Sequence, residues 1–389
     1  MTPGDIDRAL AELDAAFLKR VRRTPANPCG PEMRLEGRTL VAFANNDYLG
    51  LANDTALKKG AVEAIQQWGA GSGASSLVSG HLGIFEQLEQ QLAAFAQRQA
   101  ALFFPSGFQA NLGVLTALAD RHDVIFADRV NHASLIDGAL LSRAQHVRYQ
   151  HVDLDDLEQK LAQTPVARGG TRLIVTDSVF SMDGDEAPLQ ALMTLAEQYD
   201  AWLIVDDAHG LGVLGPQGRG SIAAAGLAPH PRLIMIGTLG KAAGVSGAFV
   251  AAEANVIEWL IQRARSYIYT TGSSPMIAGA LLASIDRILG GDDLRTQLQQ
   301  NIQHLRAGID ALNLPFALVP SRTGIQALVI GDNEQTLAVS ASLQQQGYWV
   351  PAIRPPTVPA GSARLRISLS AAHTPAHIDG LLGALGKAA

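Results

Sequence analysis

The sequence is poor in cysteine and in net charge, and each shortage excludes a class of protein. Its single cysteine, Cys29, has no partner for a disulfide within the chain, which is typical of a reducing compartment. The 30 lysines and arginines against 36 aspartates and glutamates give a net charge of −6. That balance gives no sign of nucleic-acid binding, so we expect no nucleic-acid partner.

Long apolar runs are also missing. No stretch reaches the roughly 18 uncharged apolar residues that a membrane span requires, so we expect no membrane partner. The first residues, MTPGDIDRALAELD, carry acids and lack an apolar core, which does not fit a signal peptide. We therefore expect a cytoplasmic protein.

The chain of 389 residues predicts one large and one smaller domain. From Ile84 onward, helical patterns alternate with short apolar runs bounded by glycine, which is typical of an α/β fold with a buried parallel sheet. After about residue 290 a long helical pattern and shorter strands predict an α+β domain. We predict an N-terminal helix and arm at 1–50, a large domain at 51–285 and a small domain at 286–389.

The N-terminal arm begins with an amphipathic pattern. Its apolar residues recur at steps of three and four and predict one helix; they are Ile6, Leu10, Leu13, Phe17 and Val21. A basic cluster overlaps the end of this pattern and consists of Lys19, Arg20, Arg22 and Arg23. Most of these side chains are expected in solvent, although one of them could reach an anionic substrate.

Two apolar runs in the middle of the chain end in residues capable of acid–base chemistry. AWLIVDDAHGLGVLG at 201–215 contains Asp206 and His209, and LIMIGTLGK at 233–241 contains Thr238 and Lys241. Ligands of open α/β sheets bind beyond the carboxyl ends of the strands, where these side chains would gather. A lone lysine in such a loop is more often solvated, and a lone aspartate more often caps a strand. The combination indicates a catalytic site.

Other loops allow both a functional and a plain reading. Ser106 and Phe108 lie where a strand turns into a helix, so free backbone amides there suit an anion, although a simple turn is equally compatible. The glycines of 69–80 match neither a P-loop nor a dinucleotide fingerprint. His132 follows another strand and would serve equally as a cap. The acids of 183–186 have no metal-ligand spacing and fit a turn before a helix, so we predict no metal.

Taken together, these segments resemble the α-oxoamine synthases, which are pyridoxal-phosphate enzymes with the aspartate-aminotransferase fold. The matching segments are SGF at 106–108, NHAS at 131–134, DSVFSMDGD at 177–185, VDDAHGLGVLG at 205–215, TLGK at 238–241 and RPPTVPAGSARLR at 354–366. The resemblance covers nearly the whole chain. It implies fold type I, with a mostly parallel seven-stranded sheet in the large domain, a smaller α+β C-terminal domain and an N-terminal helical arm.

The resemblance implies pyridoxal phosphate as the cofactor, with Lys241 as its covalent anchor. A free lysine amine is mostly protonated at neutral pH, and burial would favour the neutral, nucleophilic form. Asp206 would pair with the ring nitrogen and keep the ring an electron sink. His132 would stack on the ring, and His209 would bind the ring hydroxyl. Lys241, His132 and Asp206 are the expected catalytic residues.

The resemblance also implies how the rest of the cofactor is held. The amides of Gly107 and Phe108 would bind the phosphate together with Thr238, and Ser181 would make a further contact. Thr271 corresponds to a hydroxyl that this family supplies from the other subunit. A homodimer with shared active sites is therefore expected.

On the substrate side, the resemblance places the amino-acid carboxylate on Arg366, whose planar guanidinium suits a carboxylate. Asn46 and His132 would lie near the same substrate. Thr357 and an N-terminal arginine would line the acyl side. Arg22 is our choice for that arginine, with Arg20 and Arg23 as alternatives.

The stretch RPPTVPAG at 354–361 favours members of this family that condense L-alanine with a pimeloyl thioester, with loss of CO2, as in biotin biosynthesis. The thiol carrier is either coenzyme A or a carrier protein. The alternative is a glycine-using sister, such as 2-amino-3-ketobutyrate CoA ligase or 5-aminolevulinate synthase. A nicotinamide-dependent dehydrogenase would need a glycine fingerprint after its first strand, which is missing. A non-catalytic scaffold would leave the Lys, Asp, His and Thr combination unexplained.

Overall fold

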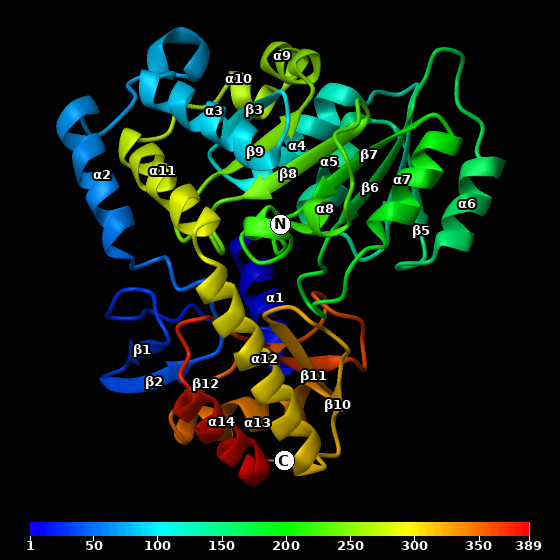
Figure 1. The fold of residues 1–389 in the computed structure, drawn as a ribbon. Helices are drawn as coiled ribbons and strands as arrows, with labels where there is room; N and C mark the ends of the chain where they lie inside the picture. The colour runs from blue at the N-terminus through cyan, green and yellow to red at the C-terminus, as the bar shows by residue number, and fades with distance from the viewer. Residues whose placement is uncertain (389) are drawn as a thin grey trace. The chain divides into compact units, whose positions relative to one another are not determined.

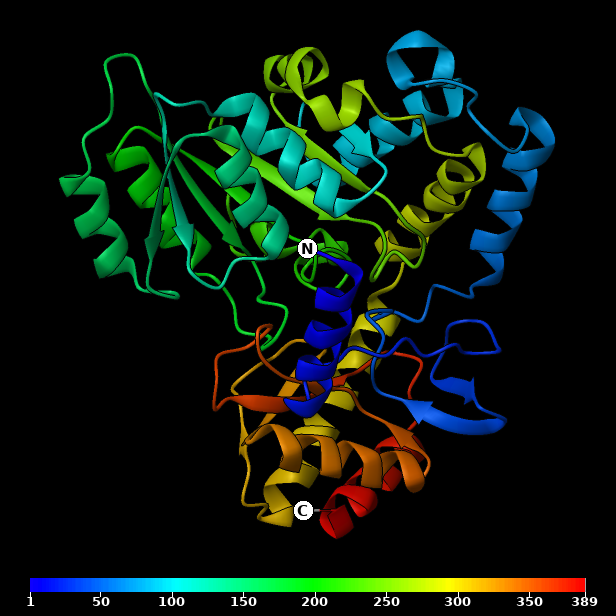
Figure 2. The ribbon, with the colours of Figure 1, turned by 180° about the vertical axis from the view of Figure 1, so that it is seen from behind.

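The computed structural model describes residues 1–388 of the chain (Figures 1 and 2). These residues form two compact units. The large unit contains residues 49–181 and 185–295, and the small unit contains residues 1–48, 182–184 and those from 296 onward. The three-part division at residues 50 and 285 stays a prediction, and its last residue, Ala389, lies outside the described residues.

A seven-stranded sheet forms the centre of the large unit. Its order is β3 (Ala100–Phe104), β9 (Ala248–Ala252), β8 (Leu233–Thr238), β7 (Ala201–Asp206), β6 (Arg172–Asp177), β4 (Val124–Asp128) and β5 (Gln145–Tyr149). The strands from β8 to β5 run parallel, whereas β9 pairs antiparallel with both of its neighbours. The predicted mostly parallel seven-stranded sheet is confirmed. Its central strands are largely apolar between their ends, as expected for strands that helices cover on both faces (Figure 1).

Helix α4 (Gly107–Leu118) lies centrally on one face of this sheet. It packs against α5 (Ala133–Ser142), α9 (Ala254–Arg263) and strands β8 and β9. Val114 and Ile234 belong to the buried cluster between this helical layer and the sheet. Further helices of the large unit are α2 (Thr55–Trp68), α3 (Gly83–Ala96), α6 (Leu154–Gln163), α7 (Leu189–Gln198), α8 (Ser221–Ala224), α10 (Arg265–Ile268) and α11 (Pro275–Leu289).

Helices α2 and α11 pack closely because a glycine lies on each of them. A Cβ added to Gly60 would come within 2.4 Å of the Gly279 carbonyl oxygen, and one added to Gly279 within 2.3 Å of the Gly60 carbonyl oxygen. No larger residue fits at either position without separating the helices. The segment that contains Thr271 leads directly into α11, so this close pair supports part of the predicted cofactor region.

The small unit is an α+β arrangement, as predicted for the C-terminal part. One sheet contains β1 (Glu32–Leu35), β2 (Arg38–Ala42) and β12 (Tyr348–Trp349); the other contains β10 (Ala317–Leu318), β11 (Ile325–Gly331), β14 (Ala363–Ser368) and β13 (Ala352–Ile353). Three longer helices accompany them: α12 (Asp292–Leu312), α13 (Asn333–Gln345) and α14 (Pro375–Ala388). The six residues of β14 are all buried, and this strand carries Arg364 and Arg366.

The N-terminal helix is shorter than its apolar pattern predicted. α1 covers Pro3–Ala15, with Thr2 as its N-cap, and ends before Phe17, which adopts a left-handed backbone with φ of 56°. The predicted continuation to Val21 is wrong, because the chain leaves the helix before the basic cluster. Within residues 1–388, no helix is long and apolar enough to cross a membrane.

Candidate active site

The carboxyl ends of β7 and β8 bring together four of the predicted site residues. β7 ends at Asp206 and is followed by His209, while β8 ends at Thr238 and is followed by Lys241. Lys241 Nζ lies 2.8 Å from His209 Nε2. His209 is buried, so an amine and an imidazole form a hydrogen bond that solvent largely does not reach.

The amino end of α4 lies beside Thr238. A Cβ added to Gly107 would come within 3.2 Å of Thr238 Oγ1, which is a tight contact, so the backbone of the helix start lies close to this hydroxyl. Ser106 is the N-cap, and its Oγ accepts the Gln109 N–H at 3.2 Å. Gly107 and Phe108 form the first turn, whose N–H groups have no acceptor inside the helix. Amides and a hydroxyl gathered at a helix N-terminus suit a phosphate.

Both the backbone and the ring of His132 are held by hydrogen bonds. Its backbone N–H donates to Asp177 Oδ2 at 2.7 Å, and its ring caps α5 by accepting the Ser134 N–H at Nδ1, at 3.3 Å. Burial lowers the pKa of His132; the charge of Asp206 opposes this shift and that of Lys241 adds to it. The ring is therefore neutral near pH 7, close enough to both groups to respond to their charges.

Two adjacent aspartates at the end of β7 have different surroundings. Asp206 Oδ1 accepts the Ala208 N–H at 3.0 Å, and its Oδ2 accepts the Asn111 amide at 2.7 Å. Asp207 is fully buried among Ser178 and Ser221, and burial raises its pKa to about 6. Asp207 thus holds the turn that follows β7, whereas Asp206 lies at the predicted cofactor position.

The glycines after Asp207 make room for its carboxylate. A Cβ added to Gly210 would lie 2.2 Å from Asp207 Oδ1, and one added to Gly220 would clash with Oδ2. Gly220 also has a φ of 95°, a conformation that L side chains rarely adopt. Gly210 of the DDAHGLG segment and Gly220 beyond it therefore give room to the Asp207 carboxylate.

The residues present in this site fit pyridoxal phosphate. The helix N-terminus beside Thr238 suits a phosphate, and the Lys241 amine suits an aldehyde. Asp206 supplies a carboxylate suited to a protonated ring nitrogen, and His132 supplies an aromatic face nearby. Ser181, also predicted here, lies in the turn that follows β6.

Thr271 lies on a segment attached to the glycine-rich stretch. Thr271 pairs with Ser75 in an isolated bridge, and the Gly272 N–H donates to the Ala74 carbonyl at 2.9 Å. Ser72 Oγ donates to the Gly272 carbonyl at 2.6 Å. The Thr271 residue itself is exposed. The glycine-rich stretch is thus held as a scaffold for the segment that presents Thr271.

Four of the predicted substrate residues, Arg22, Asn46, Thr357 and Arg366, lie in the small unit, whereas His132 belongs to the large unit. Within the small unit the structure brings Arg366 and Asn46 together. Arg366 Nη2 donates to Asn46 Oδ1 at 3.1 Å, and its Nη1 donates to Ser368 Oγ at 2.7 Å. Arg366 is only 5% exposed, so its planar group is held in a defined orientation. Thr357 is exposed in a turn, where its N–H donates to the Arg354 carbonyl at 3.1 Å.

The basic cluster of the N-terminal arm divides between solvent and a cavity of about 520 Å³ in the small unit. Arg20 and Arg23 line the cavity with Arg354 and Trp349, and Arg23 lies over the Trp349 ring at 5.5 Å. Arg22 is exposed and is not among the residues that line it. The position of Arg22 as the acyl-side arginine stays a prediction.

The acids predicted to form a turn have ionic partners. Asp183 pairs with Arg364, and Asp185 accepts from His151 Nε2 at 2.8 Å. His151 Nδ1 lies 3.0 Å from Asp128 Oδ1. Burial alone lowers the pKa of His151, but the hydrogen bonds and charges of the two aspartates outweigh it and raise the pKa to about 10. We call His151, Asp128 and Asp185 the carboxylate clasp.

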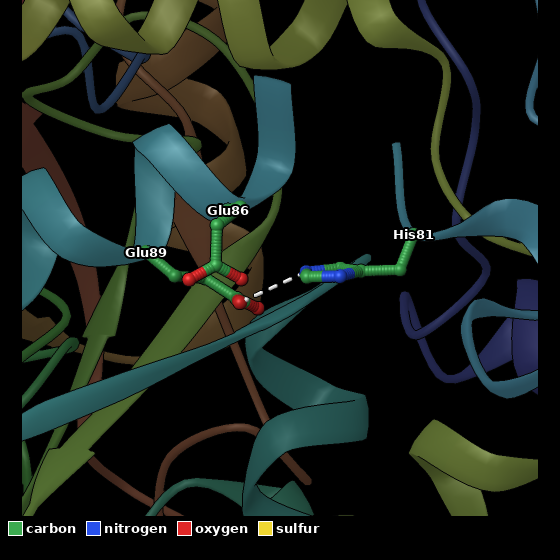
Figure 3. A group of neighbouring side chains, drawn as sticks. All are labelled: His81, Glu86 and Glu89. Atoms are coloured by element: carbon green, nitrogen blue, oxygen red, sulfur yellow. Dashed lines mark hydrogen bonds and ion pairs between the residues drawn. The ribbon is translucent and has the colours of Figure 1, made fainter. Parts of the chain in front are cut away.

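A third cluster has the composition of a metal site (Figure 3). The potential ligand atoms of His81, Glu86 and Glu89 lie within 4.8 Å of one another. His81 Nε2 is 3.0 Å from Glu89 Oε2, and the other oxygen of Glu89 accepts the Phe103 N–H at 2.9 Å. Glu86 accepts from Gln90 at 3.0 Å. These contacts tie the end of the glycine-rich stretch to α3 and β3, and we assign them no metal.

Comparison with known proteins defines the class first. The family described as aminotransferase class I and II matches residues 38–385. Serine palmitoyltransferase from Sphingomonas wittichii is 29% identical, with a TM-score of 0.92 over 99% of this chain and 97% of its own. A lysine-to-alanine variant of serine palmitoyltransferase from S. paucimobilis with a bound PLP–myriocin aldimine has a TM-score of 0.91 at 30% identity, over 99% of this chain and 96% of its own. The fold is that of the fold type I aminotransferases, as predicted.

Curated relatives narrow the assignment within this family to one group of enzymes. The 8-amino-7-oxononanoate synthase of Herminiimonas arsenicoxydans is 56% identical over 97% of both chains, and that of Dechloromonas aromatica is 51% identical over 100% of both. The solved synthase from Francisella tularensis is 34% identical, with a TM-score of 0.78 over 90% of this chain and 97% of its own. The chain therefore belongs to the class I and II aminotransferase family and, within it, to the 8-amino-7-oxononanoate synthases.

Sequence reasoning missed two side chains that contact the predicted site. Asn111 donates to Asp206, and Ser134 Oγ lies 2.7 Å from His132 Nδ1. Ser134 lies inside the NHAS segment, two residues after His132, where side chains often bond near a helix start. Asn111 is one turn beyond Gly107 on a mostly apolar helix, and such a buried amide needs partners. These two features of the sequence could have identified Ser134 and Asn111 in advance.

Proposed function

We propose that the chain condenses L-alanine with a pimeloyl thioester to give 8-amino-7-oxononanoate, CO2 and the free thiol, a step of biotin biosynthesis. The observation that carries this proposal is the near full-length identity of 51–56% to synthases of that name. The residues proposed to bind an amino acid, a thioester and a phosphorylated cofactor fit this condensation. The thiol carrier is coenzyme A or a carrier protein.

The cofactor is pyridoxal phosphate, which when bound supplies an electron sink for negative charge at the amino-acid α-carbon. Lys241 would hold its aldehyde, and Asp206 would bind the ring nitrogen. The phosphate would lie at the α4 N-terminus. Its proposed ligands are Gly107, Phe108 and Thr238, with Thr271 from the other subunit. Ser181, His209 and His132 are proposed to contact the rest of the group.

Lys241 and His209 form the proton-handling pair of this proposal. Nζ and Nε2 form a hydrogen bond at 2.8 Å, so the His209 ring holds the lysine amine in place. With its amine free, Lys241 would serve as the base for the α-proton of the amino acid. Burial around His209 excludes the water that would otherwise compete for that proton.

Arg366 is the proposed anchor for the amino-acid carboxylate. Its two terminal nitrogens are held by Ser368 and Asn46, so the plane of the guanidinium is set before the substrate arrives. A guanidinium binds a carboxylate with two parallel hydrogen bonds, which orients the substrate as well as holding it. Asn46 and His132 are proposed to contribute further polar contacts to the same substrate.

The acyl side is proposed to involve Thr357 and an arginine of the N-terminal arm. Arg20, Arg22 and Arg23 remain the candidates, and the cavity favours Arg20 and Arg23. A pimeloyl group ends in a free carboxylate on an apolar chain. The cavity offers cations beside apolar lining residues that include Phe17, Val21, Leu337 and Trp349.

This assignment can be tested by comparing two single variants. If Arg20 binds the distal carboxylate, Arg20→Gln raises the KM for pimeloyl-CoA about tenfold and leaves the KM for L-alanine unchanged. Arg22→Gln is the matched control, because the same charge is removed from an exposed site on the same arm. A rise confined to Arg22→Gln would restore Arg22 as the acyl-side residue.

A cytoplasmic homodimer with shared active sites completes the proposal. Large apolar side chains are exposed near the segment of Thr271 and along the N-terminal helix; they include Leu77, Val78, Tyr269, Met276, Ile6, Leu10 and Leu13. Exposed apolar surface of this kind supports contact with another subunit. The single cysteine fits a reducing cytoplasm.

The whole proposal is tested by visible absorption and product analysis. The purified holoenzyme is expected to be yellow, to change its spectrum with L-alanine, and to form 8-amino-7-oxononanoate, detected by mass, when pimeloyl-CoA is added. A spectrum that responds to glycine and not to alanine would move the function to a glycine-using sister. A protein without a cofactor band after reconstitution would contradict the assignment of Lys241.

A further inference from the structure

A chain of three hydrogen bonds joins Asp206 to His132 through side chains that the proposed function does not use. Asn111 Nδ2 donates to Asp206 Oδ2 at 2.7 Å and to Ser134 Oγ at 2.8 Å. Ser134 Oγ lies 2.7 Å from His132 Nδ1. Asn111 is 1% exposed and Ser134 is 0% exposed, so bulk water does not compete for these bonds.

The direction of the first bond follows from the chemistry of Asp206. An ionised carboxylate accepts hydrogen bonds and cannot donate one. If the Asn111 amide were turned over, its oxygen would face the carboxylate oxygen at 2.7 Å with no hydrogen between them. Asn111 therefore presents its NH2 group, and its two hydrogens go to Asp206 and Ser134.

The unused oxygen of the amide is a penalty of this direction. Asn111 Oδ1 is buried, and no group among residues 1–388 donates to it. A buried acceptor without a donor is unfavourable, so the amide would turn if its own oxygen decided the orientation. The two bonds of the NH2 group outweigh that loss.

Ser134 then has one hydrogen left to donate, and the acceptor within reach is His132 Nδ1. The backbone N–H of Ser134 also points to Nδ1, at 3.3 Å. An imidazole nitrogen that faces two donors carries its lone pair there. The hydrogen of the neutral ring is therefore on Nε2.

We propose that Asn111 and Ser134 are positioning residues that hold His132 in its neutral Nε2–H tautomer and make that tautomer depend on the carboxylate of Asp206. We call Asp206, Asn111, Ser134 and His132, joined by these hydrogen bonds, the relay. Its role in catalysis rests on the proposed function, in which Asp206 and His132 both contact the cofactor. The tautomer itself is a property of the chain and can be measured without turnover.

The relay divides the work between His132 and Lys241. His132 Nδ1 is occupied and cannot serve as a base, while Nε2–H is a hydrogen-bond donor for an electronegative atom of the substrate. Removal of the α-proton is then left to the Lys241 amine. Without the relay, either ring nitrogen could carry the hydrogen, and the donor would be present in only part of the molecules.

The direct test is the imidazole ¹⁵N spectrum of the protein labelled in its ten histidines, recorded with and without cofactor. The signals of His132 are identified by their loss in His132→Gln. In the wild type, Nδ1 is expected in the region of nitrogens without hydrogen and Nε2 in the region of protonated nitrogens. In Ser134→Ala and in Asn111→Leu, the Nδ1 signal is expected to move toward the protonated region. His132 Nδ1 protonated in the wild type, or unchanged in both variants, would overturn the proposal.

Kinetics supply the second readout, with a matched control. Ser134→Ala is expected to lower kcat about tenfold, the scale of about one lost hydrogen bond, and to shift the pH dependence of kcat. Ser284 is also 0% exposed, and its hydroxyl donates to the Ala243 carbonyl at 2.7 Å, outside the relay. Ser284→Ala should lose comparable stability and keep both the pH profile and the His132 spectrum. Ser134→Thr, which retains the hydroxyl, should restore the spectrum.

The outcomes separate the relay from the proposed function. A wild type with the Nε2–H tautomer that makes no product from L-alanine and pimeloyl-CoA would support the relay and contradict the reaction. Product formation together with a His132 spectrum that both Ser134→Ala and Asn111→Leu leave unchanged would support the reaction and contradict the relay. An equal loss of kcat in Ser134→Ala and Ser284→Ala, with the same pH profile, would reduce Ser134 to a packing residue and overturn the proposal.

Discussion

Two histidines that follow neighbouring parallel strands show how surroundings decide what an imidazole can do. His132 follows β4, and burial among hydrogen-bond donors lowers its pKa. His151 follows β5, the next strand of the sheet, and two aspartates raise its pKa to about 10. The first ring is neutral at pH 7 and suited to contact a cofactor. The second is a fixed cation that ties together the loops after β4 and β6.

The difference lies in the partners of the two rings more than in their depth. Both are partly withdrawn from water, and desolvation acts against the charge of both. His151 overcomes this because carboxylates bind both of its nitrogens. His132 has the hydroxyl and N–H of Ser134 at one nitrogen. Carboxylate partners keep the His151 ring protonated, which suits a structural role. Neutral hydrogen-bond donors leave the His132 ring unprotonated, which suits a role at the site.

The largest expected effect lies in the region of His132. Lys241→Ala removes both the proposed covalent anchor and the proposed base, and it should lower turnover by about 10⁴-fold or more. Stability should change little, because Lys241 lies in the loop between β8 and β9 and not in the sheet itself. Product formation from L-alanine and pimeloyl-CoA is the measurement, with circular dichroism as the control for folding. Substantial remaining turnover would remove Lys241 from the mechanism.

The next largest effect is expected at the carboxylate clasp, where we expect a loss of stability and little change in activity. His151→Gln leaves Asp128 and Asp185 as neighbouring acids without their cation, which should cost about 2–3 kcal/mol of unfolding free energy. Urea unfolding measures this loss. The activity of the folded fraction should stay within about twofold. A variant that loses activity and keeps its stability would reverse the comparison between the two histidines.

The clasp also predicts a pH dependence of stability. The pKa of His151 in the folded chain, about 10, lies above its ordinary value of 6.5, so the folded state binds the proton more tightly. The resulting stabilisation is fully present below pH 6.5, declines as the pH rises, and is lost above about pH 10. The Tm difference between the wild type and His151→Gln should shrink across that window. A constant difference from pH 6 to pH 10.5 would contradict the assignment.

The smallest effect is expected at His81, which has one carboxylate partner. The hydrogen bond to Glu89 raises the pKa of His81, so its stabilisation is likewise present at low pH and lost as the pH rises through that raised pKa. The side chain is 31% exposed, and His81→Gln should cost about 0.5 kcal/mol at pH 6. Thermal unfolding at pH 6 and pH 9 measures it. A loss as large as that of His151→Gln would show that the number of carboxylates does not decide the effect.

Much of the large unit could be predicted from local pattern. Runs such as LIMIGT are apolar without alternation and end at glycines, so β8 and its neighbours were predicted as buried parallel strands. The N-terminal helix was predicted too long, because its apolar spacing continues past Ala15 while the backbone turns at Phe17. Spacing reports which residues share a face, but not where a helix loses its next hydrogen bond.

Local sequence and the order of the strands determined which chemical groups this protein has and at which edge of a sheet they lie. Asp206, His209, Thr238 and Lys241 follow strands, and parallel strands bring their carboxyl ends to one edge. The bond between Lys241 and His209, the donation from Asn111 to Asp206 and the opposite states of His132 and His151 were decided only by the tertiary structure. Hydrogen bonds depend on distances of a few tenths of an ångström between segments far apart in the chain, and pKa values depend on what surrounds each group. Neither quantity is encoded in the spacing of residues along the sequence.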